Sequence, residues 1–142
     1  MSGSALPSQQ LGEPYRRQAT QAVTRPRRAI GPRLREDRGY LVAALSGRLD
    51  SARAPALREQ LLRLLRPAAS QLVLDLTLVS DIDAAGLAVL VGTERRARLL
   101  GGSLRLAAAR PAVSMAVHAA GLDWLLGSFP TVQAAISNLA RA

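Results

Sequence analysis

Residues 74–87 read LDLTLVSDIDAAGL, and this stretch decides the fold that we predict for the chain. It completes the run QLVLDL at 71–76, which is apolar almost throughout, as is typical of a central parallel strand buried on both faces. Asp83 then fits the N-cap of a helix, because its carboxylate can accept from the backbone N–H of Ala85 or Gly86 and opposes the helix dipole. The stretch is therefore predicted to be a strand, a loop and a helix start, at the sheet edge where binding surfaces form in open α/β folds.

The residues that follow predict a βαβ unit and two further helices. The helix after Asp83 runs to about Leu100 and ends at Gly101-Gly102, a pair typical of a helix C-terminus. The apolar run at 103–107 is a second parallel strand, reached by a right-handed crossover. Trp124 and Phe129 are expected to anchor the last helix to the core. These further helices are predicted at 111–120 and 131–140.

The residues that precede the stretch predict two strands and a helix. Pro32 cannot donate to a β-ladder, so residues 30–34 are predicted as a short edge strand, followed by a turn at 36–39. A buried strand at 40–45 ends at Ser46-Gly47, and Ser51 is the expected N-cap of a helix that Pro67 stops. The predicted fold class is α/β, in the order β-β-α-β-α-β-α-α. About four helices pack on a small, mostly parallel sheet of about four strands with one antiparallel edge strand.

Composition limits the classes of function. The 142 residues carry 19 basic side chains, all of them arginine, against 10 acids, so the formal net charge is +9. There is no cysteine and a single histidine, His118, which we expect at or near the surface of its helix. We therefore expect no thiol nucleophile, no metal centre and no cofactor. No apolar run reaches the roughly 18–20 residues of a membrane span, and the N-terminus lacks a secretory signal, so we expect a cytoplasmic protein without membrane insertion.

The first 28 residues differ from the rest of the chain. Seven arginines and only three acids fall within residues 1–37, and up to about residue 28 there is no hydrophobic periodicity. We interpret residues 1–28 as a flexible Arg-rich tail and residues 29–142 as one domain. A basic arm could bind nucleic acid with a steep dependence on salt. The tail offers only Tyr15 for stacking on bases, however, so nucleic acid is not an expected partner.

Several segments resemble the STAS domain family, the family of the anti-sigma factor antagonists. Residues 75–87 are similar to the family pattern D-L-T-x-V-x-x-I-D-x-x-G-L, and residues 46–50 resemble the S-G-x-L-D segment before the family's first helix. Residues 95–106 resemble its R-R-A…G-G-x-L-x-L stretch, and Gly121-Leu122-Asp123 resembles its corner before the last helix. The resemblance covers about residues 33–140 and implies that 29–142 form a STAS-like domain.

The resemblance implies a protein-binding regulatory module rather than an enzyme. Members bind an anti-sigma factor that is also a serine kinase, and so release a sigma factor. The kinase then phosphorylates a Ser or Thr directly after the Asp of the motif, which adds about −1.5 to −2 charge to a packed interface and ends the binding. In this chain that position is Ala84, which has no hydroxyl to phosphorylate.

Three readings of Ala84 stay open. In the first, the chain is an antagonist that phosphorylation cannot switch off at this position. In the second, it is a domain recruited to another regulatory protein or to the scaffold of a sensory or transport-associated complex. In the third, it is a degenerate copy with little binding activity. We leave a homodimer open as well.

The partner-binding surface is expected at the start of the helix and just before it. Its expected members are Ser80, Asp81, Asp83, Ala84, Ala85, Gly86, Leu87 and Val91, with Arg95 on the adjoining helix face. We interpret Asp81 and Asp83 as a loop acid and an N-cap rather than as a catalytic acid–base pair, and their charge favours a basic partner surface. The hydroxyls of Thr77 and Ser80 are expected to bond to local backbone, with Ser80 as the candidate for a relocated phosphosite.

Overall fold

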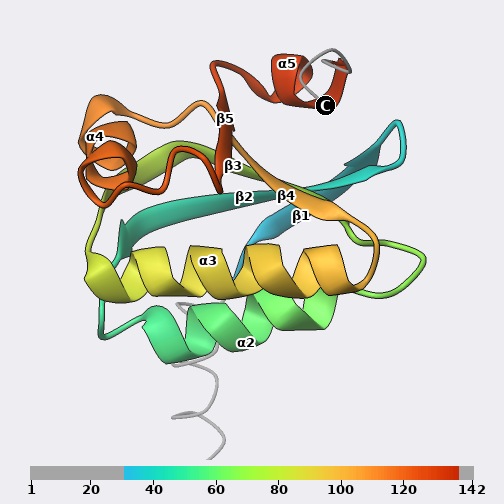
Figure 1. Ribbon diagram of the computed structural model, residues 1–142, viewed down its shortest axis with the longest axis horizontal. Coiled ribbons are helices and arrows are strands. Elements are labelled where there is room, and N and C mark those ends of the chain that lie inside the picture. Colours follow the sequence, from blue (N-terminus) through green and yellow to red (C-terminus); the bar gives the residue numbers. More distant parts are fainter. Residues whose placement is uncertain (1–30, 138–142) are drawn as a thin grey trace, which may run out of the picture. The chain divides into compact units, whose positions relative to one another are not determined.

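The computed structural model describes residues 31–137, and a five-stranded sheet lies at their centre (Figure 1). In spatial order its strands are β1 (Arg33–Asp37), β2 (Tyr40–Leu49), β3 (Gln71–Ile82), β4 (Ser103–Ala107) and β5 (Gly127–Phe129). Only the pair of β1 and β2 is antiparallel. The helices of the described part are α2 (Ala54–Leu64), α3 (Ala84–Leu99), α4 (Pro111–Ala119) and α5 (Val132–Ser137). The predicted α/β class and antiparallel edge strand are confirmed, but the sheet has five strands rather than four.

Helices cover both faces of the sheet. α2 and α3 lie side by side on one face, α5 lies on the other, and α4 lies at the end of the sheet where α3 begins (Figure 1). Alternate residues of β3 point to opposite faces of the sheet. Leu72, Leu74 and Leu76 pack in the larger core with α2 and α3, whereas Val73 packs in a smaller core with α5. The apolar run of β3 is therefore buried from both sides, as the sequence predicts.

β2 and β3 are both longer than predicted. The pair Ser46-Gly47 is predicted to end the strand at residue 45, but β2 continues through it to Leu49. The pair forms an irregularity instead: the register of β2 with β3 shifts twice around it, and Gly47 takes a left-handed φ of 82°. Arg53 holds the resulting bulge, since its Nη1 donates to the carbonyl oxygens of Ser46 and Arg48. The ladder continues beyond the bulge, so residues 77–82, predicted as loop, form the second half of β3.

The start of the first helix differs from its prediction. Ser51 is not the N-cap of α2, which begins at Ala54 behind Arg53 without a side-chain cap. The backbone N–H of Ser51 instead donates to the Asp83 carboxylate, with 3.0 Å between nitrogen and Oδ2. Asp50 provides a hydrogen-bond acceptor for the turn before the helix: its Oδ1 accepts from the backbone N–H of Arg53 at 3.2 Å.

The edge strand begins later than predicted. β1 starts at Arg33, just after Pro32, so residues 31 and 32 of the predicted strand are not part of it, and residue 30 lies outside the described residues. The turn is predicted at 36–39 but contains only Arg38 and Gly39, because Asp37 pairs with Tyr40. The φ values of Arg38 and Gly39, 52° and 86°, are those that a tight two-residue hairpin requires.

The segment before α5 contains a strand that the sequence analysis missed, β5. Phe129 is buried in the smaller core, as predicted, but the prediction for Trp124 is wrong, because its side chain is 81% exposed. Trp124 lies in a turn that faces solvent, and Leu126 is the side chain that enters the larger core there. The last helix is confirmed for 132–137, whereas residues 138–142 and the predicted tail 1–28 lie outside the described residues.

Candidate functional site

Asp83 determines where α3 begins. Its Oδ1 accepts from the backbone N–H of Gly86 at 3.0 Å, which confirms the predicted N-cap. Its Oδ2 accepts from the backbone N–H of Ser51, also at 3.0 Å. One carboxylate therefore joins the first turn of α3 to the turn that follows β2.

These hydrogen bonds make the stability contribution of Asp83 dependent on pH. The bond from Gly86, assisted by the one from Ser51, lowers the pKa of the carboxyl below its ordinary value of 3.8, with a smaller opposing effect of desolvation. Because the folded-state pKa is the lower one, the contribution is present above the unfolded-state pKa and is lost as pH falls through the folded value. We expect the stability gap between wild type and Asp83→Asn to shrink below about pH 4, as urea denaturation at several pH values would measure. Asp37→Asn, on β1, is the control, and a gap for Asp83→Asn that stays constant down to acid pH would contradict the expectation.

Gly86 lies inside the fold. A methyl group at this position would lie 2.2 Å from the carbonyl oxygen of Leu49 and 2.7 Å from Cγ1 of Ile82. The end of β2 therefore approaches the backbone of Gly86 closely, and this contact sets the distance between α3 and the sheet.

The predicted site residues differ in exposure. Ser80, Asp83 and Ala84 are exposed, Asp81, Ala85 and Val91 are partly buried, and Gly86 and Leu87 are buried. Asp81 lies on β3 rather than in a loop, with its Oδ2 3.6 Å from Nε of Arg48. The hydroxyl of Thr77 donates to the Asp75 carboxylate at 2.6 Å, so its partner is a side chain rather than the expected backbone.

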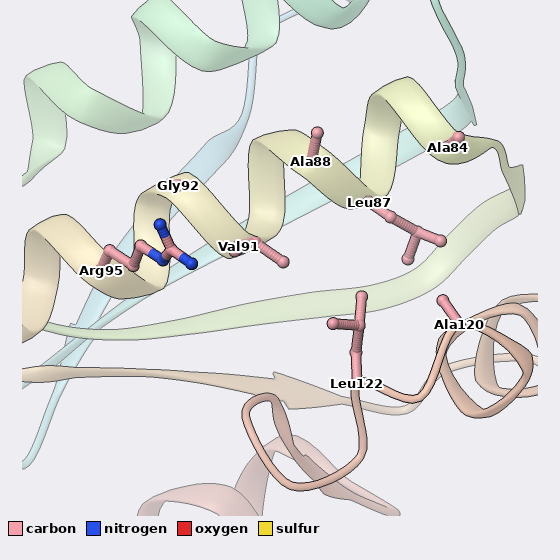
Figure 2. Close-up of a pocket in the computed structure, with 8 residues that line it drawn as sticks. All are labelled: Ala84, Leu87, Ala88, Val91, Gly92, Arg95, Ala120 and Leu122. Carbon is pink, nitrogen blue, oxygen red and sulfur yellow. The ribbon is translucent and has the colours of Figure 1, made fainter.

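A groove of about 420 Å³ runs along α3 from Ala84 to Arg95 (Figure 2). Leu87 and Val91 point into it from α3, and Leu122 faces them from the segment after α4. The complete lining is Ala84, Leu87, Ala88, Val91, Gly92, Arg95, Ala120 and Leu122. Ala84, Leu87 and Val91 of the predicted site are thus brought together in one apolar groove, with the charge of Arg95 at its far end.

Sequence reasoning missed four residues of this lining. Ala88 and Gly92 repeat Ala84 at intervals of four, a helical spacing that is visible in the sequence. Ala120 and Leu122 come from a segment about thirty residues later, and no local pattern brings them to α3.

Other kinds of site are not found in the described part of the chain. Within residues 31–137, no group of three or more His, Cys, Asp or Glu side chains is arranged to hold a metal ion. No helix in that range has the length and apolar character to cross a bilayer. His118 is exposed at the end of α4, as predicted, and its Nδ1 lies 2.6 Å from Oδ2 of Asp123.

Solved structures share this fold. A putative anti-sigma factor antagonist from Thermotoga maritima matches with a TM-score of 0.71 and 18% identity over 78% of this chain and 95% of that chain. An anti-sigma factor antagonist from Mycobacterium paratuberculosis matches with a TM-score of 0.68 and 27% identity over 77% of this chain and 92% of that chain. The murine Solute Carrier 26 family member A9 anion transporter matches with a TM-score of 0.66 and 17% identity, over 76% of this chain but only 19% of the transporter.

The family is established by its sequence model. No curated protein matches this sequence. The family model described as "STAS domain" matches residues 31–135, which include all five strands of the described residues and the groove along α3. The chain therefore belongs to the STAS domain family.

Proposed function

We propose that this chain is an anti-sigma factor antagonist that binds an anti-sigma factor with serine kinase activity, and so favours release of a sigma factor. The observation that carries the proposal is the exposed Ala84, at the first position of α3 and at one end of an apolar groove. The similarity to the mycobacterial anti-sigma factor antagonist, at 27% identity over most of both chains, supports the same kind of partner. In this proposal the chain acts in the cytoplasm by binding and not by catalysis.

The chemistry of the groove supports a protein partner. Leu87 and Val91 offer apolar surface, and the small side chains of Ala84 and Ala88 let a partner's backbone approach closely. Asp83 adds negative charge at the rim, which favours a partner that presents basic groups there.

Ala84 determines how such a complex would be regulated. A hydroxyl at this position would be solvent-exposed and open to a kinase, and its phosphate would introduce negative charge beside Asp83 in a packed interface. Alanine removes the acceptor oxygen, so the proposed complex cannot be ended by phosphorylation at this position.

Substitution of Ala84 tests the proposal. We expect Ala84→Asp to raise the Kd for the anti-sigma factor kinase of the same cell by about 10- to 100-fold, because a charge is buried in the interface. Isothermal titration calorimetry with the purified kinase measures this. Ala56→Asp is the matched control, because Ala56 is also exposed in the first turn of a helix, α2, which packs on the other side of α3 from the groove (Figure 2).

A second arm tests the switch itself. Ala84→Ser restores an acceptor hydroxyl, so incubation with the kinase and ATP should phosphorylate this variant at residue 84 and weaken its complex, whereas the wild type stays bound. Equal affinity of wild type and Ala84→Asp would contradict the proposed interface.

The match to the anion transporter favours a second candidate function, as a domain of a larger assembly. In that case neither wild type nor Ala84→Ser would bind the kinase, and both would co-purify with the same non-kinase protein.

A further inference from the structure

The end of β2 repeats the end of β3. The last residues of the two strands, Leu49 and Ile82, are partners in the parallel ladder, and each is followed by an aspartate. The next residue is Ser51 after β2 and Ala84 after β3. Both α2 and α3 begin at this end of the sheet (Figure 1). Ser51 therefore has the same place at the end of β2 that Ala84 has at the end of β3.

Ser51 also lies next to the first turn of α3 in space. Its backbone N–H donates to Oδ2 of Asp83 at 3.0 Å, and Asp83 is the residue directly before Ala84. A second hydrogen bond joins the same two segments, because the backbone N–H of Asp83 donates to the carbonyl oxygen of Leu49 at 3.2 Å. Both Ser51 and Ala84 are exposed. Ser51 thus supplies a hydroxyl to the surface on which Ala84 lacks one.

The side chain of Ser51 is not used to cap the helix that follows it. α2 begins at Ala54 without a side-chain cap. The hydrogen bond from Ser51 to Asp83 uses the backbone N–H, which every residue except proline can provide. Ser80 is exposed as well, but it lies within β3, so it does not follow the end of a strand as Ser51 does.

We propose that Ser51 is a phosphorylation site, which the kinase of the proposed complex modifies slowly. This inference rests on the proposed function and deepens it, because it gives the complex a form of regulation that Ala84 cannot provide. In the transfer, the hydroxyl oxygen of Ser51 forms a bond to the γ-phosphorus of ATP. The bond between that phosphorus and the bridging oxygen breaks, ADP leaves with the electron pair, and the hydroxyl proton passes to the catalytic base of the kinase.

The position of Ser51 explains why this transfer is slow. Neighbouring strands lie about 4.8 Å apart, so a hydroxyl at Ser51 is displaced by about that distance from one at residue 84. A kinase that is aligned with residue 84 holds Ser51 outside the in-line geometry, and a displacement of about 1 Å can already slow a reaction about 100-fold. The wild type therefore stays bound during an incubation that releases Ala84→Ser, and it is modified only over much longer times.

A phosphate on Ser51 weakens the complex through its charge. Asp50 directly precedes Ser51 and Asp83 accepts from its backbone N–H, so about −1.5 to −2 of added charge lies beside two carboxylates. We expect Ser51→Asp, which introduces part of that charge, to raise the Kd for the kinase by about 10-fold. Ser128→Asp is the matched control, because Ser128 is an exposed serine on β5, which β3 and β4 separate from β2. Isothermal titration calorimetry measures both variants.

A time course of phosphorylation tests the site directly. Wild type, Ser51→Ala and Ala84→Ser are each incubated with the purified anti-sigma factor kinase and ATP, and mass spectrometry of the intact chain and of its peptides gives the amount and position of phosphate. We expect Ala84→Ser to be modified first, at residue 84. The wild type should be modified at Ser51 at least about 100-fold more slowly, and Ser51→Ala should stay unmodified. Ser51→Ala keeps the backbone N–H that bonds to Asp83, so it should fold as the wild type does.

The variant Ala84→Ser separates failure of this inference from failure of the proposed function. If Ala84→Ser is phosphorylated but Ser51 of the wild type is unmodified after an incubation about 1,000 times longer, the inference is overturned and the proposed function stands. Phosphate on Ser80 instead of Ser51, or an unchanged Kd for Ser51→Asp, overturns it as well. If Ala84→Ser is not phosphorylated either, the proposed kinase partner is contradicted and the inference fails with it.

Discussion

Gly86→Ala is expected to destabilise the chain by about 3 kcal/mol or more, because the added methyl group overlaps with backbone. The methyl would lie 2.2 Å from the carbonyl oxygen of Leu49, which accepts from the backbone N–H of Asp83 at 3.2 Å and so cannot move freely. The nearest side-chain atom, Cγ1 of Ile82, lies 2.7 Å away in a buried residue. Relief therefore requires α3 to move away from β2. The free energy of unfolding in urea measures this effect.

Gly92→Ala is the matched control, six residues further along the same helix. Nothing lies within 4 Å of the added methyl group, so this variant should be more stable than the wild type by about 0.5–1 kcal/mol. Opposite signs for one substitution in one helix would separate the packing role of Gly86 from the intrinsic helix propensity of glycine. Similar losses at both positions would contradict the close contact with Leu49.

Local signals predicted the start of α3 but not the length of the strands. Asp83 was predictable as an N-cap because its hydrogen bond to Gly86 spans only three residues. Ser46-Gly47 looks like the end of a strand when it is read alone. Its bulge depends on Arg53 and on pairing with β3, which are contributed by other elements of the fold. The sequence alone therefore predicts a strand end where the structure has an irregularity within a longer strand.

The same distinction between local signals and contacts from distant elements applies to the candidate site. Ala84, Leu87 and Val91 were predictable because helical periodicity places them on neighbouring turns of α3. Leu122 was not, because it reaches the groove only through the packing of α4 at the end of the sheet. Glu94 was not singled out either, since it lies in the run TERRAR at 93–98, which reads as a charged, solvent-exposed segment.

Glu94 is in fact fully buried, and its loss is expected to cost about 2–3 kcal/mol. Its Oε1 accepts from the backbone N–H of Leu104 at 2.9 Å, and its Oε2 accepts from Nε of Arg98. One side chain thus joins α3 to the first half of β4. Glu94→Ala removes the acceptor and leaves the buried N–H of Leu104 without this partner, in addition to a cavity in the core. Chemical denaturation of the full chain measures the loss.

Two variants show which part of this arrangement stabilises the fold. Glu94→Gln keeps an oxygen that can accept from Leu104, so it should retain most of the stability although the ion pair with Arg98 is lost. Glu59→Ala breaks a pair with the same spacing on α2, in which Oε2 lies 2.8 Å from Nη2 of Arg63, but both side chains there are exposed, so the cost should stay below about 0.5 kcal/mol. If Glu94→Gln were instead as destabilising as Glu94→Ala, the charge pairing with Arg98 rather than the hydrogen bond to β4 would be the dominant interaction.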